Sequence, residues 1–404
     1  MSIFNLSRSI CSGRPYSKTL IRWQSSSNPA VNQLLTLQQM EICADPPSRA
    51  AIFGVYADEN DKNDGGILTP SGWNYNIKKT GGRLLEALRL SGPMPRKGEA
   101  RPIAIVGLGK ECLGFNSYEV IDEQKETIRR STAAACRQLC KLQTDRIEVE
   151  SLGHAESAAE GAALGVWKYQ EFKMLKDKQD IPTIDLYSIK DEPCDFDGWR
   201  IGLQKAAAQN LTRTLQEMPS NILTPTAFAQ TVVEVLCKTG INVEVKVEGW
   251  AEGHGMNPFL AVGRASCEAP IFLELSYYGA PSDERPIVLI GQGITYDSGG
   301  LSLKKYKYLR HLRGDMTGAA VVVSTMRAIA SLRLPINIRA LIPLCENVLG
   351  CNAFKPGDCY KSMAGKTVEV ESTDKEDTLN LIDALLYAQN FCPKFIILEQ
   401  RLIP

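Results

Sequence analysis

Apolar and polar positions form blocks along this chain, and the blocks follow two different periods. Short, nearly continuous apolar runs are typical of buried strands, whereas apolar residues recurring every three or four positions are typical of helices. Strands are predicted at residues 101–110, 242–247, 271–275, 287–290, 336–345 and 395–398. Helices are predicted at residues 118–143, 155–173, 197–218 and 317–332. Strands separated by helices predict an α/β fold, with a mostly parallel sheet flanked by helices in the later part of the chain.

The length of 404 residues predicts two domains, because single hydrophobic cores rarely grow so large. The composition becomes charged and proline-containing at 176–200, which we interpret as a linker. We therefore expect a smaller N-terminal α/β domain at 31–175 and a larger domain at 201–404.

The first 40 residues contain no Asp or Glu, whereas Arg8, Arg14, Lys18 and Arg22 are spaced among serines and apolar residues. A basic, serine-rich, acid-free start is typical of a mitochondrial presequence, which we place at residues 1–30. The alternative is a disordered basic tail on a cytoplasmic protein.

Charge and cysteine content exclude several classes of protein. Lys+Arg and Asp+Glu both number 46, so the net charge of +0 gives no attraction for nucleic acid or an anionic membrane. No apolar run approaches the roughly 20 residues of a membrane helix, so we expect no membrane insertion. The 12 Cys form no CxxC pair and only 3 His are present, which argues against a structural zinc site and favours reduced core cysteines.

Four carboxylates follow predicted strands or precede predicted helices, within segments 287–304, 312–323 and 371–388. They are Asp297, Asp315, Asp374 and Glu376. Loops at the carboxyl ends of parallel strands meet at one edge of a sheet, so we expect these side chains to converge. A lone carboxylate at a helix start is usually a cap, but four together repel one another unless a cation lies between them. Divalent metals supply such charge, activate water and polarise carbonyls.

Four segments resemble the signature blocks of the leucine aminopeptidase family, the two-metal M17 peptidases: GQGITYDSGGLSLK, RGDMTGAA, PLCENVLGCNAFKPGD and STDKEDTLNLIDALLYA. The resemblance extends from about residue 35 to the end of the chain. It implies two divalent metals (manganese or zinc), removal of residues such as Leu from peptides with a free N-terminus, and a homo-oligomer, the hexamer.

The resemblance also implies roles for individual residues. The four carboxylates fall on metal-ligand positions, and Lys304 falls on the catalytic lysine that helps to polarise the scissile carbonyl. The metal-ligand lysine of the family is replaced by Gln292. The catalytic arginine, which holds a bicarbonate in the family, is replaced by Thr378. In the same block, Lys375 and Asp377 stand where the family has Ala and Gly.

Each replacement has a physical consequence. The amide oxygen of Gln292 is a weaker metal donor than an amine, and Thr378 cannot form the charged, bidentate fork with an anion that arginine provides. Lys375 either acts as an internal cation beside the carboxylates or points to solvent. The basic segment KKYKYLRHLRGD (304–315) is either a solvated face or a source of further cations for the acidic cluster.

The family continues beyond the strand that resembles residues 394–400, so we expect a shortened C-terminus and an incomplete catalytic domain. Three functions remain open. The preferred one is a catalytically impaired homologue with a structural or assembly role in mitochondria, similar to the insect sperm leucyl aminopeptidases. The alternatives are an active two-metal leucyl aminopeptidase and a binding module for peptides or metal without turnover.

Overall fold

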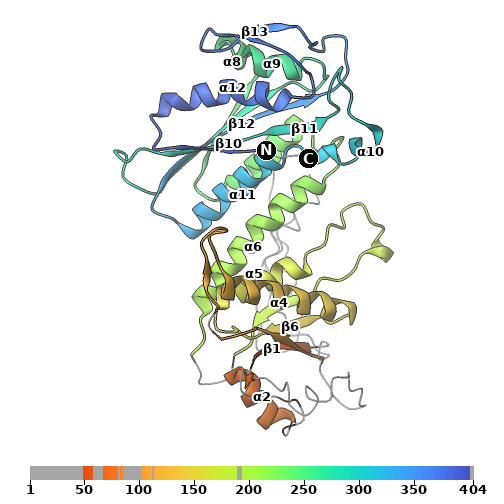
Figure 1. Cartoon of the computed structure of the whole chain (residues 1–404), viewed down its shortest axis with the longest axis vertical. Coiled ribbons are helices and arrows are strands. Elements are labelled where there is room, and N and C mark those ends of the chain that lie inside the picture. Colours follow the sequence, from red (N-terminus) through yellow and green to blue (C-terminus); the bar gives the residue numbers. More distant parts are fainter. Residues whose placement is uncertain are drawn as a thin grey trace, which may run out of the picture. The chain divides into compact units, whose positions relative to one another are not determined.

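A computed structural model describes residues 49–57, 67–80, 82, 84, 102–111, 113–188 and 193–400. The predicted presequence at 1–30 lies outside the described residues. The chain divides into two compact units, residues 1–207 and 208–404 (Figure 1). Both contain a sheet and helices, so the two-domain α/β prediction is confirmed.

The first unit is built on a five-stranded sheet centred on β1 (Arg49–Tyr56). Its other strands are β2 (Ile67–Leu68), β3 (Ile103–Gly107), β6 (Arg146–Val149) and β7 (Thr183–Leu186). Strands β3 and β6 are parallel to β1, β7 is parallel to β6, and β2 is antiparallel to β1. The predicted linker at 176–200 therefore contains a strand of this sheet, because Thr183–Leu186 pair with β6.

The helices of the first unit include α4 (Glu123–Lys141) and α5 (Ala155–Val166). The remaining short elements are α2 (Pro70–Thr80), β4 (Phe115–Asn116), β5 (Ile121–Asp122) and η1 (Leu175–Asp177). Helix α5 is shorter than the predicted 155–173, because the backbone becomes extended at Trp167, with φ −64° and ψ 137°. Apolar faces of α4 and α5 close the core over β1 and β6 (Figure 1).

Small residues let α4 and α5 approach closely. A Cβ atom on Gly161 of α5 would lie 2.2 Å from the carbonyl oxygen of Arg129 in α4. Backbone atoms cannot move aside as a flexible side chain can, so this position requires glycine.

We expect Gly161→Ala to lower the free energy of unfolding of the first unit by about 2 kcal/mol, since overpacking outweighs the gain in helix propensity. The matched control is Gly107→Ala at the end of β3, where an added Cβ meets no atom within 4 Å. Urea denaturation of both variants measures the difference; equal stability of the two would contradict the close-packing argument.

The second unit contains a six-stranded mixed sheet in the order β15-β10-β12-β9-β8, with β11 also paired to β12. The strands are β8 (Asn242–Val247), β9 (Ile271–Tyr278), β10 (Ile287–Gly291), β11 (Gly293–Asp297), β12 (Asn337–Asn347) and β15 (Ile396–Glu399). Strands β10, β11, β12 and β15 pair in parallel, whereas β8 and β9 form the antiparallel side.

Helices lie on both faces of this sheet. Helix α11 (Thr317–Leu332) lies on one face, and α8 (Glu248–Gly253), α9 (Asn257–Gly263) and α12 (Glu376–Ala388) lie on the other (Figure 1). The remaining elements are α6 (Phe196–Glu217), α7 (Pro225–Leu236), α10 (Tyr306–Leu309), η2 (Leu312–Gly314), η3 (Gln389–Phe391), β13 (Cys359–Lys361) and β14 (Thr367–Glu369). Among the described residues, no helix is long and apolar enough to span a membrane.

Gln292 lies between strands β10 and β11 and separates them. Close packing against the backbone requires glycine on both sides: a Cβ on Gly291 would lie 2.8 Å from Ala319 Cα, and one on Gly293 would lie 2.5 Å from the Pro343 carbonyl oxygen. The Gln292 N–H donates to the Glu399 carbonyl, and its own carbonyl accepts from the Ala319 N–H. The backbone of Gln292 is thus fixed where α11 begins and β10 ends.

Candidate metal centre

Two segments of the second unit bring acidic side chains to one edge of its sheet. Asp297 ends β11, Asp374 lies in the turn before α12, and Glu376 is the first residue of α12. One oxygen from each of these three carboxylates lies within 4.8 Å of the others. Asp297 and Glu376 are buried, whereas Asp374 is exposed. The predicted convergence of these three residues is therefore present in the fold.

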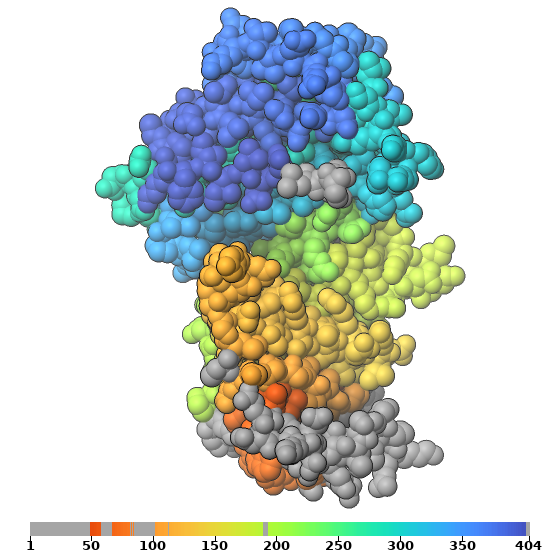
Figure 2. All heavy atoms as spheres, viewed as in Figure 1, coloured from red at the N-terminus to blue at the C-terminus, as the bar shows by residue number. Residues whose placement is uncertain are grey.

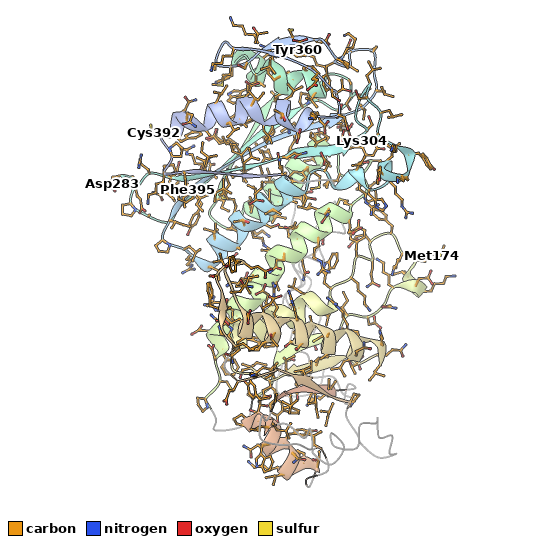
Figure 3. The ribbon with its side chains drawn as sticks, in the orientation of Figure 1. Met174, Asp283, Lys304, Tyr360, Cys392 and Phe395 are labelled. Carbon is orange, nitrogen blue, oxygen red and sulfur yellow. The ribbon has the colours of Figure 1, made fainter. Side chains whose placement is uncertain are left out.

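Lys304 binds two of these carboxylates. Its Nζ lies 2.7 Å from Asp297 Oδ2 and 2.6 Å from Asp374 Oδ1, where the chain leaves β11 towards α10 (Figure 3). Burial disfavours the charged amine, but the hydrogen bonds to Asp297 and Asp374 outweigh this effect and raise the pKa of Lys304 above its usual value. Lys304 is therefore an ammonium at neutral pH.

Asp315 is hydrogen-bonded to Gln292. Gln292 Nε2 donates a hydrogen bond of 2.6 Å to Asp315 Oδ2, and both side chains are almost fully buried. Gln292 Oε1 has no hydrogen-bond partner among the described residues. The sequence thus identified the residues of this contact, but not the direct hydrogen bond between them.

Asn347 and Thr373, which the sequence analysis did not single out, join the loops of the centre. Asn347 Nδ2 donates to Asp297 Oδ1 at 2.9 Å and to the Thr373 carbonyl at 3.1 Å. Thr373 Oγ1 donates to the Gly299 carbonyl and accepts from the Ser302 N–H. A buried Asn at the carboxyl end of a parallel strand was the available signal for this role.

The turn after β11 requires two glycines. Gly299 and Gly300 have φ values of +83° and +62°, in the left-handed region that glycine adopts without strain. A Cβ on Gly300 would lie 3.0 Å from Asn347 Oδ1. The turn packs directly on the side chain that orients Asp297.

Glu376 carries an unusual protonation equilibrium. Burial, together with repulsion from Asp297 and Asp315, raises the pKa of Glu376 to about 9. Its Oε2 has no hydrogen-bond partner among the described residues. A carboxyl group held in this way is protonated at neutral pH without a cation and would ionise when one binds.

Thr378 and Lys375 lie at the exposed start of α12. The Thr378 N–H donates to Asp377 Oδ1 at 2.7 Å, so this turn is closed by its own acidic residue. In the described part of the chain, Lys375 forms no ion pair with the acidic cluster. The internal cation that the sequence analysis considered at Lys375 is supplied in the structure by Lys304.

Residues 306–313 of the basic segment, which are cyan in Figure 2, contribute to the lining of a separate cavity of about 790 Å³ on the second unit. Its basic side chains come from Lys307, Arg310, His311 and Arg313. Arg313 also pairs with Glu217 at 2.8 Å. Among the ion pairs of the described residues, Lys304 is the member of this segment that reaches the acidic cluster.

Comparison with known proteins identifies the ancestry of this arrangement. Residues 210–398 match the catalytic domain of the cytosol aminopeptidase family, and residues 52–176 match its N-terminal domain. The cytosol aminopeptidase of Xenopus tropicalis is 37% identical over 393 residues, which cover 94% of this chain and 73% of that protein. This chain belongs to the cytosol aminopeptidase family.

Other members of the cytosol aminopeptidase family and solved structures agree with this placement. The Bos taurus protein is 39% identical over 363 residues, covering 87% of this chain and 68% of that protein. The bottromycin maturation enzyme BotP, solved in complex with Mn, is similar with a TM-score of 0.68 and 25% identity, covering 87% of this chain and 72% of that chain. The family is one of metal-dependent peptidases.

The donors fit one divalent cation better than two. Asp297, Asp374 and Glu376 offer close carboxylate oxygens, and Glu376 Oε2 is buried without a partner among the described residues. Gln292 and Asp315 instead satisfy each other by a hydrogen bond. A cation held by the three carboxylates would supply Lewis acidity and a more acidic bound water. Lys304 could then orient a carbonyl oxygen by donating a hydrogen bond to it.

Proposed function

We propose that this member of the cytosol aminopeptidase family is catalytically impaired and has a structural or assembly role in mitochondria. The observation that carries the proposal is the start of α12, where the exposed Thr378 donates to Asp377. The family resemblance places a catalytic arginine at this position. Threonine carries no permanent charge and cannot donate a bidentate pair of hydrogen bonds, so an anionic general base has no binding site there.

Other features support the proposed location and assembly state. The acid-free, basic segment at 1–30 supports import into mitochondria. The family resemblance supports a homo-oligomer, the hexamer, with manganese or zinc as the metal. A stable oligomer requires its interfaces to be retained, whereas it does not require an intact catalytic arginine.

The second candidate is an active leucyl aminopeptidase that acts on peptides with a free N-terminus. Lys304 and the four carboxylates support it, because these residues occupy the positions that the resemblance assigns to catalysis and metal binding. The two candidates differ in turnover and can be separated by a direct assay.

Hydrolysis of leucine amide with added Mn²⁺ or Zn²⁺ is the test. We expect turnover at least about a hundredfold below that of the Bos taurus relative assayed in parallel, the loss that removal of a general base typically causes. The combined variant Gln292→Lys, Lys375→Ala, Asp377→Gly and Thr378→Arg should regain part of the activity. Turnover of the unmodified chain close to that of the bovine protein would establish the second candidate instead.

A further inference from the structure

We infer that the centre takes up one divalent cation, at Asp297, Asp374 and Glu376, and that Gln292, which donates to Asp315 and supplies no amine ligand, leaves no site for a second. The inference rests on the proposed function only in using the same acidic centre. It concerns how many cations bind, and it can fail while the proposed loss of activity holds.

The three-carboxylate half of the centre is prepared for a cation. Divalent metals bind carboxylate oxygens at about 2.0–2.6 Å, so oxygens already within 4.8 Å of one another need to move little. Asp297 is oriented through Oδ1 by the Asn347 amide and by the Gly299 N–H at 2.8 Å, which leaves Oδ2 directed to the cluster. Glu376 contributes an oxygen that no described group satisfies.

Lys304 competes with the cation for this half. Its ammonium occupies Asp297 Oδ2 and Asp374 Oδ1, so it must leave before both oxygens can bind a metal. The neighbouring side chains of Leu303 and Lys305 are exposed, and the backbone here is neither helix nor strand. Lys304 can therefore turn towards solvent once a divalent cation replaces its charge beside Asp297 and Asp374.

The other half is already satisfied by a neutral group. The Gln292 amide donates to Asp315 Oδ2, so the NH₂ side of the amide, not its oxygen, faces the carboxylate. To serve as a ligand, the amide would have to turn its oxygen towards a shared cation and give up this bond. The fixed backbone of Gln292, hydrogen-bonded to Glu399 and Ala319, prevents the loop from moving to accommodate both.

The test is titration of the metal-free full-length chain with Mn²⁺ by calorimetry, together with electron paramagnetic resonance of the loaded protein. We expect one ion per chain and the six-line spectrum of an isolated Mn²⁺. Gln292→Lys, which supplies a longer side chain with an amine donor, should raise the count to two and produce a spin-coupled pair. The control Gln292→Leu, which removes the donor without adding a ligand, should leave the count at one.

Two further variants locate the ion. Glu376→Gln should weaken Mn²⁺ binding at least about tenfold. Asp358→Asn, at an exposed turn paired with Lys355, should leave it unchanged. Circular dichroism identifies any variant that fails to fold, in which case Asp374→Asn replaces Glu376→Gln.

Three results would each overturn the inference. They are two coupled ions in the unmodified chain, no bound ion, and an affinity for Mn²⁺ that neither Glu376→Gln nor Asp374→Asn changes. Hydrolysis measured on the same samples separates it from the proposed function. One ion with turnover at the level of the family would refute only the proposed function, and two ions without turnover would refute only this inference.

Discussion

Replacement of Lys304 by methionine is expected to lower the free energy of unfolding of the metal-free protein by about 3 to 5 kcal/mol, the range measured when one partner of a buried ion pair is removed. The ammonium lies between Asp297, whose side chain is 1% exposed, and Asp374. Methionine keeps the volume of the side chain but removes the charge, so Asp297 is left ionised and buried or must take up a proton. Urea denaturation with a chelator present measures the loss.

The matched control is Lys375→Met, which removes the same charge from the turn that carries Asp374. We expect a change within about 0.5 kcal/mol, because this side chain is exposed and has no ion pair among the described residues. Added Mn²⁺ should restore stability to Lys304→Met, since a divalent cation replaces the missing charge. Equal losses in the two variants would show that the position of the ammonium is unimportant.

The stability of the metal-free protein should fall by about 3 kcal/mol between about pH 6 and pH 8 because of Glu376. Its carboxyl group has a pKa of about 9 in the folded protein, raised from 4.5 by burial and by repulsion from Asp297 and Asp315. Between these values the folded state holds a proton that the unfolded state has released. The stabilisation is complete below pH 4.5 and disappears as the pH rises through 9.

Denaturant unfolding at a series of pH values, with Glu376→Gln alongside, measures this dependence. The glutamine variant should lack the slope, because its amide does not titrate, while Glu371→Gln at an exposed position should keep it. Mn²⁺ should also remove the slope, since a bound cation favours the ionised carboxylate. Parallel curves for Glu376→Gln and the unmodified protein would contradict the raised pKa.

Much of the fold could be predicted from apolar patterns alone. The runs at 271–275 and 287–290 are strands, because they are apolar enough to be buried in the sheet. The run at 242–247, in which valines alternate with polar residues, is an edge strand without buried residues. Strand β11 was not predicted, since GITYD looks like part of a glycine-rich loop. Its existence depends on pairing with β12, a contact between segments far apart in the sequence.

The candidate site could likewise be predicted only in part from the sequence. Sequence placed Asp297, Asp374 and Glu376 together, because strand ends and helix starts fix where such residues lie. It could not choose between Lys304 and Lys375 as the neighbouring cation. Adjacent positions at the start of a helix point in different directions, so Lys375 is close to Asp374 in sequence but not in its contacts. Lys304 belongs to the loop after β11, and its contact with Asp374 can be seen only in the folded chain.

The turn at Gly299 and Gly300 has a consequence for the evolution of this chain. Its left-handed backbone and its packing on Asn347 depend on several residues at once, so a chain that lost this turn could not recover it by one substitution. Substitutions at Gln292 and Thr378, in contrast, would change single side chains and leave this turn in place. The proposed loss of catalysis would therefore be reversible by a few substitutions, because the turn that shapes the acidic centre is retained.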